Sequence, residues 1–336
     1  MLDYELLRLI WWALLGVLLV GFAVTDGFDL GVGMLFMLAA GESERDLMMN
    51  SVAPVWDGNE TWLVMGGIGL YAAFPLAFGI LMPALYFPIL FMLLGLIFRG
   101  VAFEFRPTSG DNKRRWDWAF CIGSLVATFA QGCVLGNFVL GFDVQNGRFV
   151  GNSLDWLHPF VLAVGLGLIF GYVLLGATWL GMKTQGDLQA WARRASRYAL
   201  WGVLAFIGMV SIVTPLIDTS IAARWFDWPN TLWLAPIPIL TLLCAWSVWR
   251  SLNSRREAWP FFGSMGLFLL CYLGLGISLF PYIVPRHLTL AEAASAPQAQ
   301  AFLLIGTLFL LPIILTYTGW SYWVFGGKVK AHIGYH

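Results

Sequence analysis

Long apolar stretches separated by short polar segments dominate the sequence. A membrane-spanning helix needs about 20 mostly apolar residues. Nine stretches of this kind run over residues 8–39, 54–75, 78–98, 117–142, 158–181, 198–217, 231–249, 259–284 and 300–325. They are continuously apolar, unlike the alternating segments of about ten residues that build membrane barrels. The pattern predicts an all-α membrane protein, a polytopic bundle of about nine transmembrane helices in which residues 1–336 form a single transmembrane domain.

Lysine and arginine residues are distributed unequally between the two sets of loops. If nine helices alternate in direction, the loops on the side of the C-terminus contain 15 of the 19 basic residues. The other side contains only Arg8, Arg148, Arg224 and Arg286. Because cytoplasmic loops of membrane proteins are enriched in lysine and arginine, we expect a cytoplasmic C-terminus and an N-terminus on the outer side.

Composition excludes several other classes of protein. Hydrophobic residues make up 59% of the chain and charged residues 11%, and the formal net charge is zero. A typical soluble domain is about 25% charged, a disordered chain is low in hydrophobicity, and a nucleic-acid-binding protein has a basic surface. These classes are excluded, so the expected surroundings are a lipid bilayer and no nucleic acid.

Cysteine and histidine residues are few and poorly placed to bind a metal or a haem. The four cysteines stand at positions 121, 133, 244 and 271 without a Cys-x-x-Cys spacing, so we expect buried free thiols. His158 and His287 lie at the outer ends of predicted helices, and His332 and His336 lie in the C-terminal tail. Haem requires an axial ligand such as histidine, and methionine in apolar helices usually serves packing. We therefore expect no metal site and no haem ligand from this chain.

Asp26 and Asp29 lie deep within the first predicted helix, in the segment Thr-Asp-Gly-Phe-Asp-Leu-Gly-Val-Gly. Their spacing places both on one helix face, and two carboxylates so close in a low dielectric cannot both ionise cheaply. Ionisable residues inside spanning helices are costly and usually functional, so the pair is a candidate proton relay. The alternative is an ion pair with a basic residue elsewhere in the bundle, or hydrogen bonds that hold helices together. Glycines 27, 31 and 33 are expected to allow close helix packing.

A second pair of acids, Asp57 and Glu60, opens the second predicted helix in the segment Trp-Asp-Gly-Asn-Glu-Thr-Trp. The two are again three residues apart and are expected to share a face. Helix capping and compensation of the helix dipole would be sufficient to explain Asp57. They explain Glu60 less well, because Glu60 lies deeper among apolar residues.

Three further charged residues lie near the predicted cytoplasmic face. Arg99 and Glu104 flank the end of the third predicted helix. A mutual ion pair is the simplest interpretation, and an entrance for protons is the alternative. Asp117 begins the fourth predicted helix and is most simply a helix-start acid. With a rise of about 1.5 Å per residue, Asp26 lies roughly 20 Å from the cytoplasmic end of its helix. The acids thus occupy the cytoplasmic half of the bundle, as expected for a half-channel open to that side.

Several motifs follow one another along the whole chain and are densest in residues 1–118. They are Gly-Phe-Asp-Leu-Gly-Val-Gly at 27–33, Asn-Ser-Val-Ala-Pro-Val-Trp-Asp-Gly-Asn-Glu-Thr-Trp-Leu at 50–63, Leu-Ile-Phe-Arg-Gly-Val-Ala-Phe-Glu-Phe-Arg at 96–106, Trp-Asp-Trp at 116–118, Phe-Pro-Tyr-Ile-Val-Pro at 280–285 and Thr-Tyr-Thr-Gly-Trp-Ser-Tyr-Trp at 316–323. Together they resemble subunit II of the cytochrome bd-type ubiquinol oxidases. The exact sequence of the second motif resembles most the members of the cyanide-insensitive branch.

The resemblance implies a heterodimeric, electrogenic oxidase of the bacterial inner membrane, in some members with a small accessory membrane subunit. Such an enzyme oxidises quinol and reduces O2 to water. The haems, b and d or b-type only, and the quinol-oxidation site belong to subunit I. Subunit II has nine helices and, with the charge distribution given above, a periplasmic N-terminus. Some members also hold a structural quinone in subunit II.

The resemblance further implies that subunit II supplies a proton pathway from the cytoplasm to subunit I. Asp57 and Glu104 match the acids of that pathway, and Asp26 and Asp29 match the paired acids of the first helix. Glu104 stands where longer relatives have aspartate, which moves the carboxyl by one methylene. Glu60 stands where some members have glutamine, so it adds a carboxyl that either joins the pathway or is neutral and packed.

Two other functions remain compatible with these residues. A proton-coupled secondary transporter also contains intramembrane carboxylates and helices broken by glycine or proline, although an odd number of spans suits inverted repeats poorly. A purely structural assembly subunit would use the acids only to hold helices together. Co-purification with a second, haem-bearing subunit would favour the oxidase, and solute transport by the isolated, colourless chain would favour the transporter.

Overall fold

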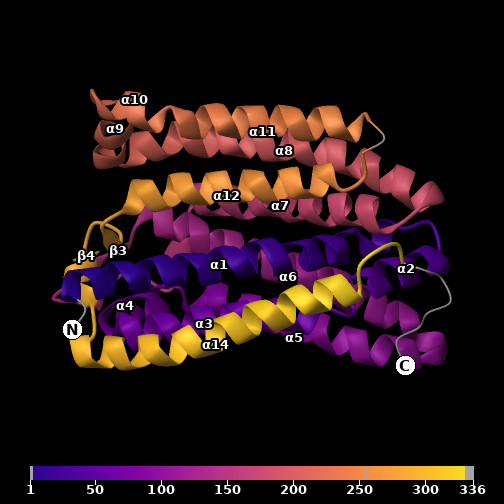
Figure 1. The fold of residues 1–336 in the computed structure, drawn as a ribbon, viewed down its shortest axis with the longest axis horizontal. Coiled ribbons are helices and arrows are strands. Elements are labelled where there is room, and N and C mark those ends of the chain that lie inside the picture. Colours follow the sequence, from indigo (N-terminus) through magenta and orange to yellow (C-terminus); the bar gives the residue numbers. More distant parts are fainter. Residues whose placement is uncertain (1–2, 255, 330–336) are drawn as a thin grey trace.

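The structure, a computed structural model, describes residues 3–254 and 256–329. It is almost entirely helical (Figure 1). The helices are α1 (Tyr4–Leu35), α2 (Glu42–Val52), α3 (Trp56–Ala73), α4 (Pro75–Ala84), α5 (Tyr86–Thr108), α6 (Lys113–Leu140), α7 (Pro159–Lys183), α8 (Gly186–Ile217), α9 (Thr219–Phe226), α10 (Asn230–Leu234), α11 (Pro236–Leu252), α12 (Trp259–Leu279), α13 (Leu290–Ala293) and α14 (Pro297–Val324).

Short elements connect these helices. Two small antiparallel hairpins pair β1 (Val144–Gln145) with β2 (Arg148–Phe149), and β3 (Tyr282–Val284) with β4 (Leu288–Thr289). Single turns of 3-10 helix lie at η1 (Phe36–Leu38), η2 (Gly110–Asn112) and η3 (Asp155–Leu157).

Eight helices of the described chain are long and apolar enough to cross a membrane. They are α1 with η1, α5, α6 with η2, α7, α8, α11 with α10, α12 and α14. The predicted span 54–75 corresponds to α3, whose 18 residues do not meet the same criterion. The all-helical membrane fold is therefore confirmed, whereas the number nine stays a prediction.

The predicted third span, residues 78–98, is wrong in its limits. The chain leaves helical geometry at Phe74 and again at Leu85, so α4 is a separate helix of ten residues. Pro75 begins α4, and Pro88 in the first turn of α5 cannot donate a hydrogen bond to the carbonyl of Ala84. The spanning helix here is α5, which continues to Thr108.

Other predicted limits also shift, most of all that of the sixth helix, which begins twelve residues before the predicted start, at Gly186. The fourth helix begins four residues before the predicted start, at Lys113. The eighth ends at Leu279, five residues before the predicted end, because Pro281 follows and the chain turns into β3.

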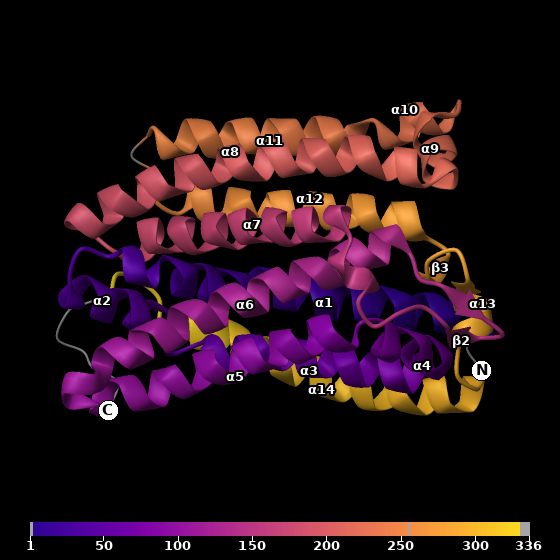
Figure 2. The same cartoon turned by 180° about the vertical axis from the view of Figure 1, so that it is seen from behind.

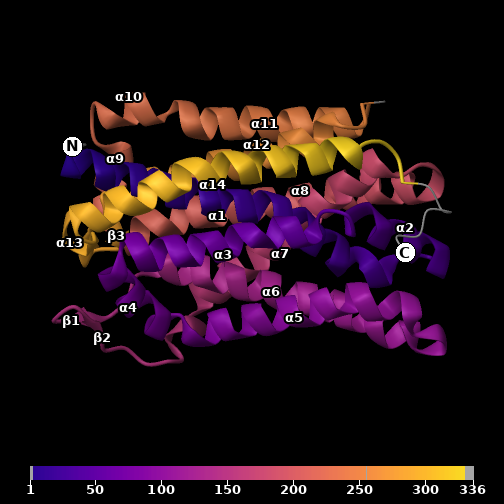
Figure 3. The same ribbon diagram turned by 60° about the horizontal axis from the view of Figure 1, so that its bottom comes forward.

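The long helices run side by side along the long axis of the molecule in stacked layers. From the top of Figure 1, α8 and α11 form the first layer, α7 and α12 the second, and α1 and α6 the third, with α3, α5 and α14 below them. Figure 2 shows the same order from behind. In Figure 3, α14 runs beside α1 and α3, which it also contacts. The central helix is α1, because it packs against α3, α6 and α7.

The two ends of the bundle differ in charge. The start of α1 and the end of α14 lie at opposite ends (Figure 1), as an odd number of crossings requires. The α5–α6, α7–α8 and α11–α12 connections, which with the adjoining helix turns are rich in lysine and arginine, lie together with α2 at one end. We call it the basic end. Which side of a membrane it occupies stays a prediction.

Glycines bring α1, α6 and α7 into close contact. A Cβ atom on Gly31 would lie 1.8 Å from the carbonyl oxygen of Tyr172, and one on Gly176 would lie 2.4 Å from the backbone of Gly31. A Cβ atom on Gly33 would lie 2.0 Å from the Ser124 hydroxyl. Any side chain at these positions would separate the helices, so the expected close packing is confirmed.

The prediction that all four cysteines are buried is wrong in part. Each is a free thiol, but only Cys133 is buried; Cys121 and Cys244 are half-buried, and Cys271 is exposed on α12. Cys271 lies in an apolar run because α12 is a spanning helix. In such a helix, residues that face outward from the chain are apolar as well, so an apolar run does not show that a residue is buried.

Histidines lie outside the middle of the bundle wherever the structure describes them. His158 caps α7, where its Nδ1 accepts a hydrogen bond from the backbone N–H of Phe160. His287 lies between β3 and β4. Lys330, His332 and His336 are outside the described residues.

Candidate proton-transfer site

A buried arginine organises the acids that the sequence singles out. Arg99 of α5 donates to the carboxylate of Asp26 on α1 at 2.5 Å and to that of Glu60 on α3 at 2.7 Å. The side chains of Arg99 and Asp26 are 0% exposed, and that of Glu60 is 28% exposed. The ion pair that the sequence offers as an alternative for Asp26 is therefore present.

Asp29 belongs to the same cluster but has a different partner. Its carboxylate accepts a hydrogen bond of 2.8 Å from the side-chain amide of Asn59. The Asn59 carbonyl in turn accepts one of 2.7 Å from the hydroxyl of Tyr322, on α14. Asp29 is fully buried, so this neutral amide takes the place that the guanidinium of Arg99 takes for Asp26.

Asn59 and Tyr322 were not predicted as site residues. Both lie within motifs that carry the family resemblance, at 50–63 and 316–323. Membership of these motifs is the one feature of the sequence that points to them as site residues. Neither is ionisable near neutral pH in an ordinary setting. A search for charged residues in apolar helices therefore passes over them.

The electrostatics of the cluster favour a shared proton. Three carboxylates, the buried ones of Asp26 and Asp29 and the partly exposed one of Glu60, lie around one buried guanidinium. If all three were ionised, two negative charges would remain uncompensated in a low dielectric, which is costly. At least one carboxyl of the three is therefore expected to carry a proton.

Asp57 and Glu104 do not join this cluster. Both are exposed on the surface of this chain. They flank one contact, in which the rings of Trp56 and Phe103 stack with centroids 4.8 Å apart. The structure thus brings Asp57 and Glu104 to the same part of the surface, where α3 meets α5.

The predicted pairing of Arg99 with Glu104 is wrong. Residues five positions apart on an α-helix point about 140° apart, so Arg99 faces the core while Glu104 faces outward. The prediction relied on the closeness of the two residues in the sequence and did not account for the direction of each side chain.

The interpretation of Asp117 as a helix-start acid is also wrong. Because α6 begins at Lys113, Asp117 lies in its second turn and is 3% exposed. Its carboxylate accepts a hydrogen bond of 2.5 Å from Arg106 and lies 3.1 Å from Arg45. Arg106 also donates to Asp46 at 2.6 Å. The network fastens α2 to α5 and α6 at the basic end.

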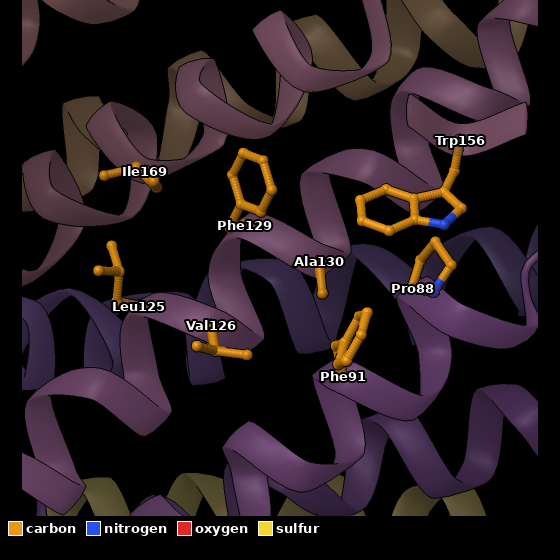
Figure 4. Close-up of a pocket in the computed structure, with 8 residues that line it drawn as sticks. All are labelled: Pro88, Phe91, Leu125, Val126, Phe129, Ala130, Trp156 and Ile169. Carbon is orange, nitrogen blue, oxygen red and sulfur yellow. The ribbon is translucent and has the colours of Figure 1, made fainter. Parts of the chain in front are cut away.

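A separate cavity of about 270 Å³ contains none of these residues. It opens between α5, α6, α7 and η3 (Figure 4). Its lining is formed by Pro88, Phe91, Leu125, Val126, Phe129, Ala130, Trp156 and Ile169. Such a lining suits an apolar occupant. In the described part of the chain, histidine, cysteine and acidic residues form no group able to hold a metal ion.

The fold and the buried cluster define a polytopic membrane protein with ionisable residues at its centre. The sequence profile of the family "Cytochrome bd terminal oxidase subunit II" matches residues 7–325, so the chain belongs to that family. Because members are one part of a respiratory oxidase in the bacterial inner membrane, a partner subunit is implied. The family resemblance is confirmed, and the transporter alternative is set aside.

Individual relatives agree with this assignment. The chain is 35% identical to the cytochrome bd-I ubiquinol oxidase subunit 2 of Escherichia coli K12, over 98% of this chain and 97% of that protein. It is 30% identical to the cytochrome bd ubiquinol oxidase subunit 2 of Bacillus subtilis, over 96% of each. The structure of bd oxidase from Geobacillus thermodenitrificans has a similar fold, with a TM-score of 0.73, 18% identity and coverage of 93% of this chain and 96% of that one.

Proposed function

We propose that this subunit II carries protons from the cytoplasm toward a haem-bearing subunit I that oxidises quinol and reduces O2. Relatives named as ubiquinol oxidase subunits support the substrate. The location of the acids supports the proton pathway. The haems, of b and d or only b type, are proposed to be bound by the partner, where quinol and O2 react. A small accessory subunit, a quinone bound to this chain and membership of the cyanide-insensitive branch stay predictions.

The basic end is proposed to face the cytoplasm, because cytoplasmic loops are enriched in lysine and arginine. This orientation places the start of α3 and the end of α5, with Asp57 and Glu104, near the cytoplasmic surface. The buried cluster of Asp26, Asp29 and Arg99 lies further in. Protons would therefore enter at the surface acids and move inward to the cluster.

The observation that carries the proposal is the exposure of Asp57 and Glu104 beside the contact between α3 and α5. Carboxylates that face lipid are costly, by several kcal/mol in contested estimates. We infer that subunit I covers the surface where α3 meets α5, so that both acids line a route between the two subunits. A route at that boundary would supply protons to Glu60 and Asp29 of the cluster as well as to the partner.

Asp57→Asn tests the pathway in the purified two-subunit oxidase. The amide keeps the shape of the side chain but cannot pass a proton, so O2 reduction with quinol is expected to fall by about 10²-fold while haem content stays normal. Oxygen consumption and proton uptake in proteoliposomes measure the effect.

Asp187→Asn is a matched control for this experiment. Asp187 is an exposed acid in the first turn of α8 at the same basic end, far from α3 and α5. This variant is expected to behave like the wild-type protein. Full proton-coupled turnover of Asp57→Asn with intact haems would eliminate the assigned role.

The buried ion pair between Asp26 and Arg99 supports a structural role for Asp26. Breaking such a pair is strongly destabilising because it leaves an uncompensated charge. We therefore assign Asp26 and Arg99 to positioning the cluster, and Asp29 and Glu60 to proton transfer.

A further inference from the structure

A stripe of buried polar residues on α6 plays no part in the pathway described above. Ser124, Thr128 and Gln131 lie four and three residues apart, so they share one helix face. Ser124 and Thr128 are 0% exposed and Gln131 is 9% exposed. Polar residues repeated along one face of a spanning helix need partners, because lipid and apolar side chains offer none.

The hydroxyls of Ser124 and Thr128 behave differently from most buried hydroxyls in the bundle. Thr178, Ser196 and Ser264 each donate to a carbonyl one turn earlier on their own helix, at 2.7–2.8 Å. Neither Ser124 nor Thr128 has a hydrogen-bond partner within residues 3–254 and 256–329. The Ser124 oxygen lies instead directly against Gly33 of α1.

Gln131 is held by a tyrosine at the other end of the stripe. The Tyr172 hydroxyl donates to the Gln131 side-chain carbonyl at 2.8 Å. Its ring lies against Gly27, the neighbour of Asp26, where an added Cβ atom would be 2.7 Å from the ring. This bond fixes the orientation of the Gln131 amide, whose nitrogen has no partner in the described part of the chain.

The two aspartates of α1 each have one oxygen left over. Oδ1 of Asp26 is bound to Arg99 and Oδ2 of Asp29 to Asn59, whereas Oδ2 of Asp26 and Oδ1 of Asp29 have no hydrogen-bond partner in the structure as described. Carboxylate oxygens accept, an amide nitrogen donates and hydroxyls do both. The unpartnered atoms are therefore chemically complementary.

We propose that α1, α6 and α7 enclose a water-binding site that links the free oxygens of Asp26 and Asp29 to Ser124, Thr128 and Gln131. Buried water typically makes about three hydrogen bonds to otherwise unsatisfied polar groups, and this set supplies both donors and acceptors. Tyr172 is a positioning residue, because it orients the Gln131 amide toward the water. Use of this water in proton transfer rests on the proposed function, whereas its presence does not.

X-ray radiolysis of the intact two-subunit oxidase in H2(18)O tests the site directly. Hydroxyl radicals formed from bound water oxidise the side chains beside it, and mass spectrometry locates the label. Tyr172 is expected to be modified several-fold faster than Phe120, a buried aromatic residue on the same helix as the stripe. Modification of Tyr172 no faster than that of Phe120 would overturn the proposal.

Two variants and one control identify the residues that bind the water. Thr128→Val is nearly isosteric, and Gln131→Leu removes the amide; each is expected to lower Tyr172 modification several-fold. Thr178→Val removes a buried hydroxyl of α7 that bonds only to its own helix, and modification is expected to stay at the wild-type rate. Unchanged modification in both test variants would refute the assigned ligands. Haem content verifies assembly in each case.

The same variants separate this proposal from the pathway proposal. Labelling of Tyr172 reports water whether or not the enzyme turns over, and loss of turnover in Asp57→Asn reports the pathway whether or not water is bound. Labelled Tyr172 with an active Asp57→Asn enzyme would support the site and reject the pathway. Unlabelled Tyr172 with an inactive Asp57→Asn enzyme would do the reverse.

Discussion

Asp26 and Asp29 lie one turn apart on α1 and are both fully buried, yet they have different chemical partners. Asp26 faces the guanidinium of Arg99, which favours its charged form. Asp29 bonds to the amide of Asn59, so it can gain or lose a proton without breaking an ion pair with that partner. These partners support the proposed division of the pair into Asp26, which holds the cluster together, and Asp29, which would exchange protons.

The Arg99–Asp26 pair makes a prediction about stability. Arg99→Leu leaves Asp26 and Glu60 without their shared cation, so it should destabilise the subunit by about 3–5 kcal/mol. The double variant Arg99→Leu/Asp26→Leu removes both charges of the fully buried pair and should recover much of this loss. Thermal unfolding of the purified complex, followed through its haem absorbance, measures both effects.

Arg115→Leu serves as the control for that comparison. Arg115 is exposed at the start of α6, and its removal should leave the unfolding temperature nearly unchanged. A single Arg99→Leu variant as stable as the wild-type protein would show that the buried pair contributes little.

Sequence reasoning located these acids but not their partners. An acid within an apolar run is visible in one dimension, which is why Asp26, Asp29 and Glu60 were identified. The sequence pairs Arg99 with the nearby Glu104, because nothing in the sequence indicates that α1, α3 and α5 contact one another at the level of Arg99. Partner choice depends on helix direction and side-chain orientation, and both arise only on packing.

At the scale of elements, an arginine between β3 and β4 joins helix ends at the end of the bundle opposite the basic end. Arg286 donates to the carboxylate of Asp218, at the end of α8, and to the carbonyl of Leu140, at the end of α6, both at 2.6 Å. Helix ends leave carbonyl groups without intrahelical partners. Arg286 also donates to the carbonyl of Val139 at 3.3 Å, so it satisfies two such groups while it joins two helices through a hairpin.

Asp218 makes the stability of this junction depend on pH. Burial tends to raise its pKa, but hydrogen bonds from Ser220 and Arg286 outweigh burial and lower the pKa to about 2 from an ordinary 3.8. A lowered pKa means that the carboxylate stabilises the fold above pH 4 and that this contribution is lost as the pH falls from about 4 toward 2. Since Arg286 is 36% exposed, the contribution is on the order of 1 kcal/mol.

Asp218→Asn should therefore lower the unfolding temperature of the complex by a few degrees at pH 7, and the difference should shrink below pH 4. Unfolding curves of the two proteins at matched pH values between 7 and 3 measure it. The same difference at every pH would mean that the charge of Asp218 does not stabilise the junction.

Apolar runs predicted most spanning helices because a run of sufficient length has few alternatives in a bilayer. They failed where a continuous apolar run contains a break between two helices, as at Leu85, and where a helix is not apolar throughout. The amphipathic α2 was not predicted for that reason, although it carries Arg45 and Asp46 of the network around Asp117. Helices that do not cross the membrane lack the long apolar run by which a spanning helix is predicted.

At the scale of the whole molecule, Asp57 continues an outward-facing stripe of α3. Val64, Ile68 and Tyr71 follow it at seven, eleven and fourteen residues, and all three are more than half exposed. On α5, Ile97 lies seven residues before Glu104 and is 59% exposed. A surface that combines apolar stripes with a carboxyl at the end of each suits a protein neighbour better than lipid, because only a protein can supply polar partners.

Photo-crosslinking distinguishes a protein neighbour from lipid. With p-benzoylphenylalanine at Tyr71, which is 62% exposed on α3, irradiation of the assembled oxidase should give a covalent adduct with subunit I. The same substitution at Tyr198, which is 78% exposed on α8 in the opposite layer, should not. An adduct at Tyr198 and none at Tyr71 would move the boundary between the subunits to the α8 side. Asp57 and Glu104 would then face lipid in the assembled enzyme, and protons would have to reach the partner through the interior of this chain.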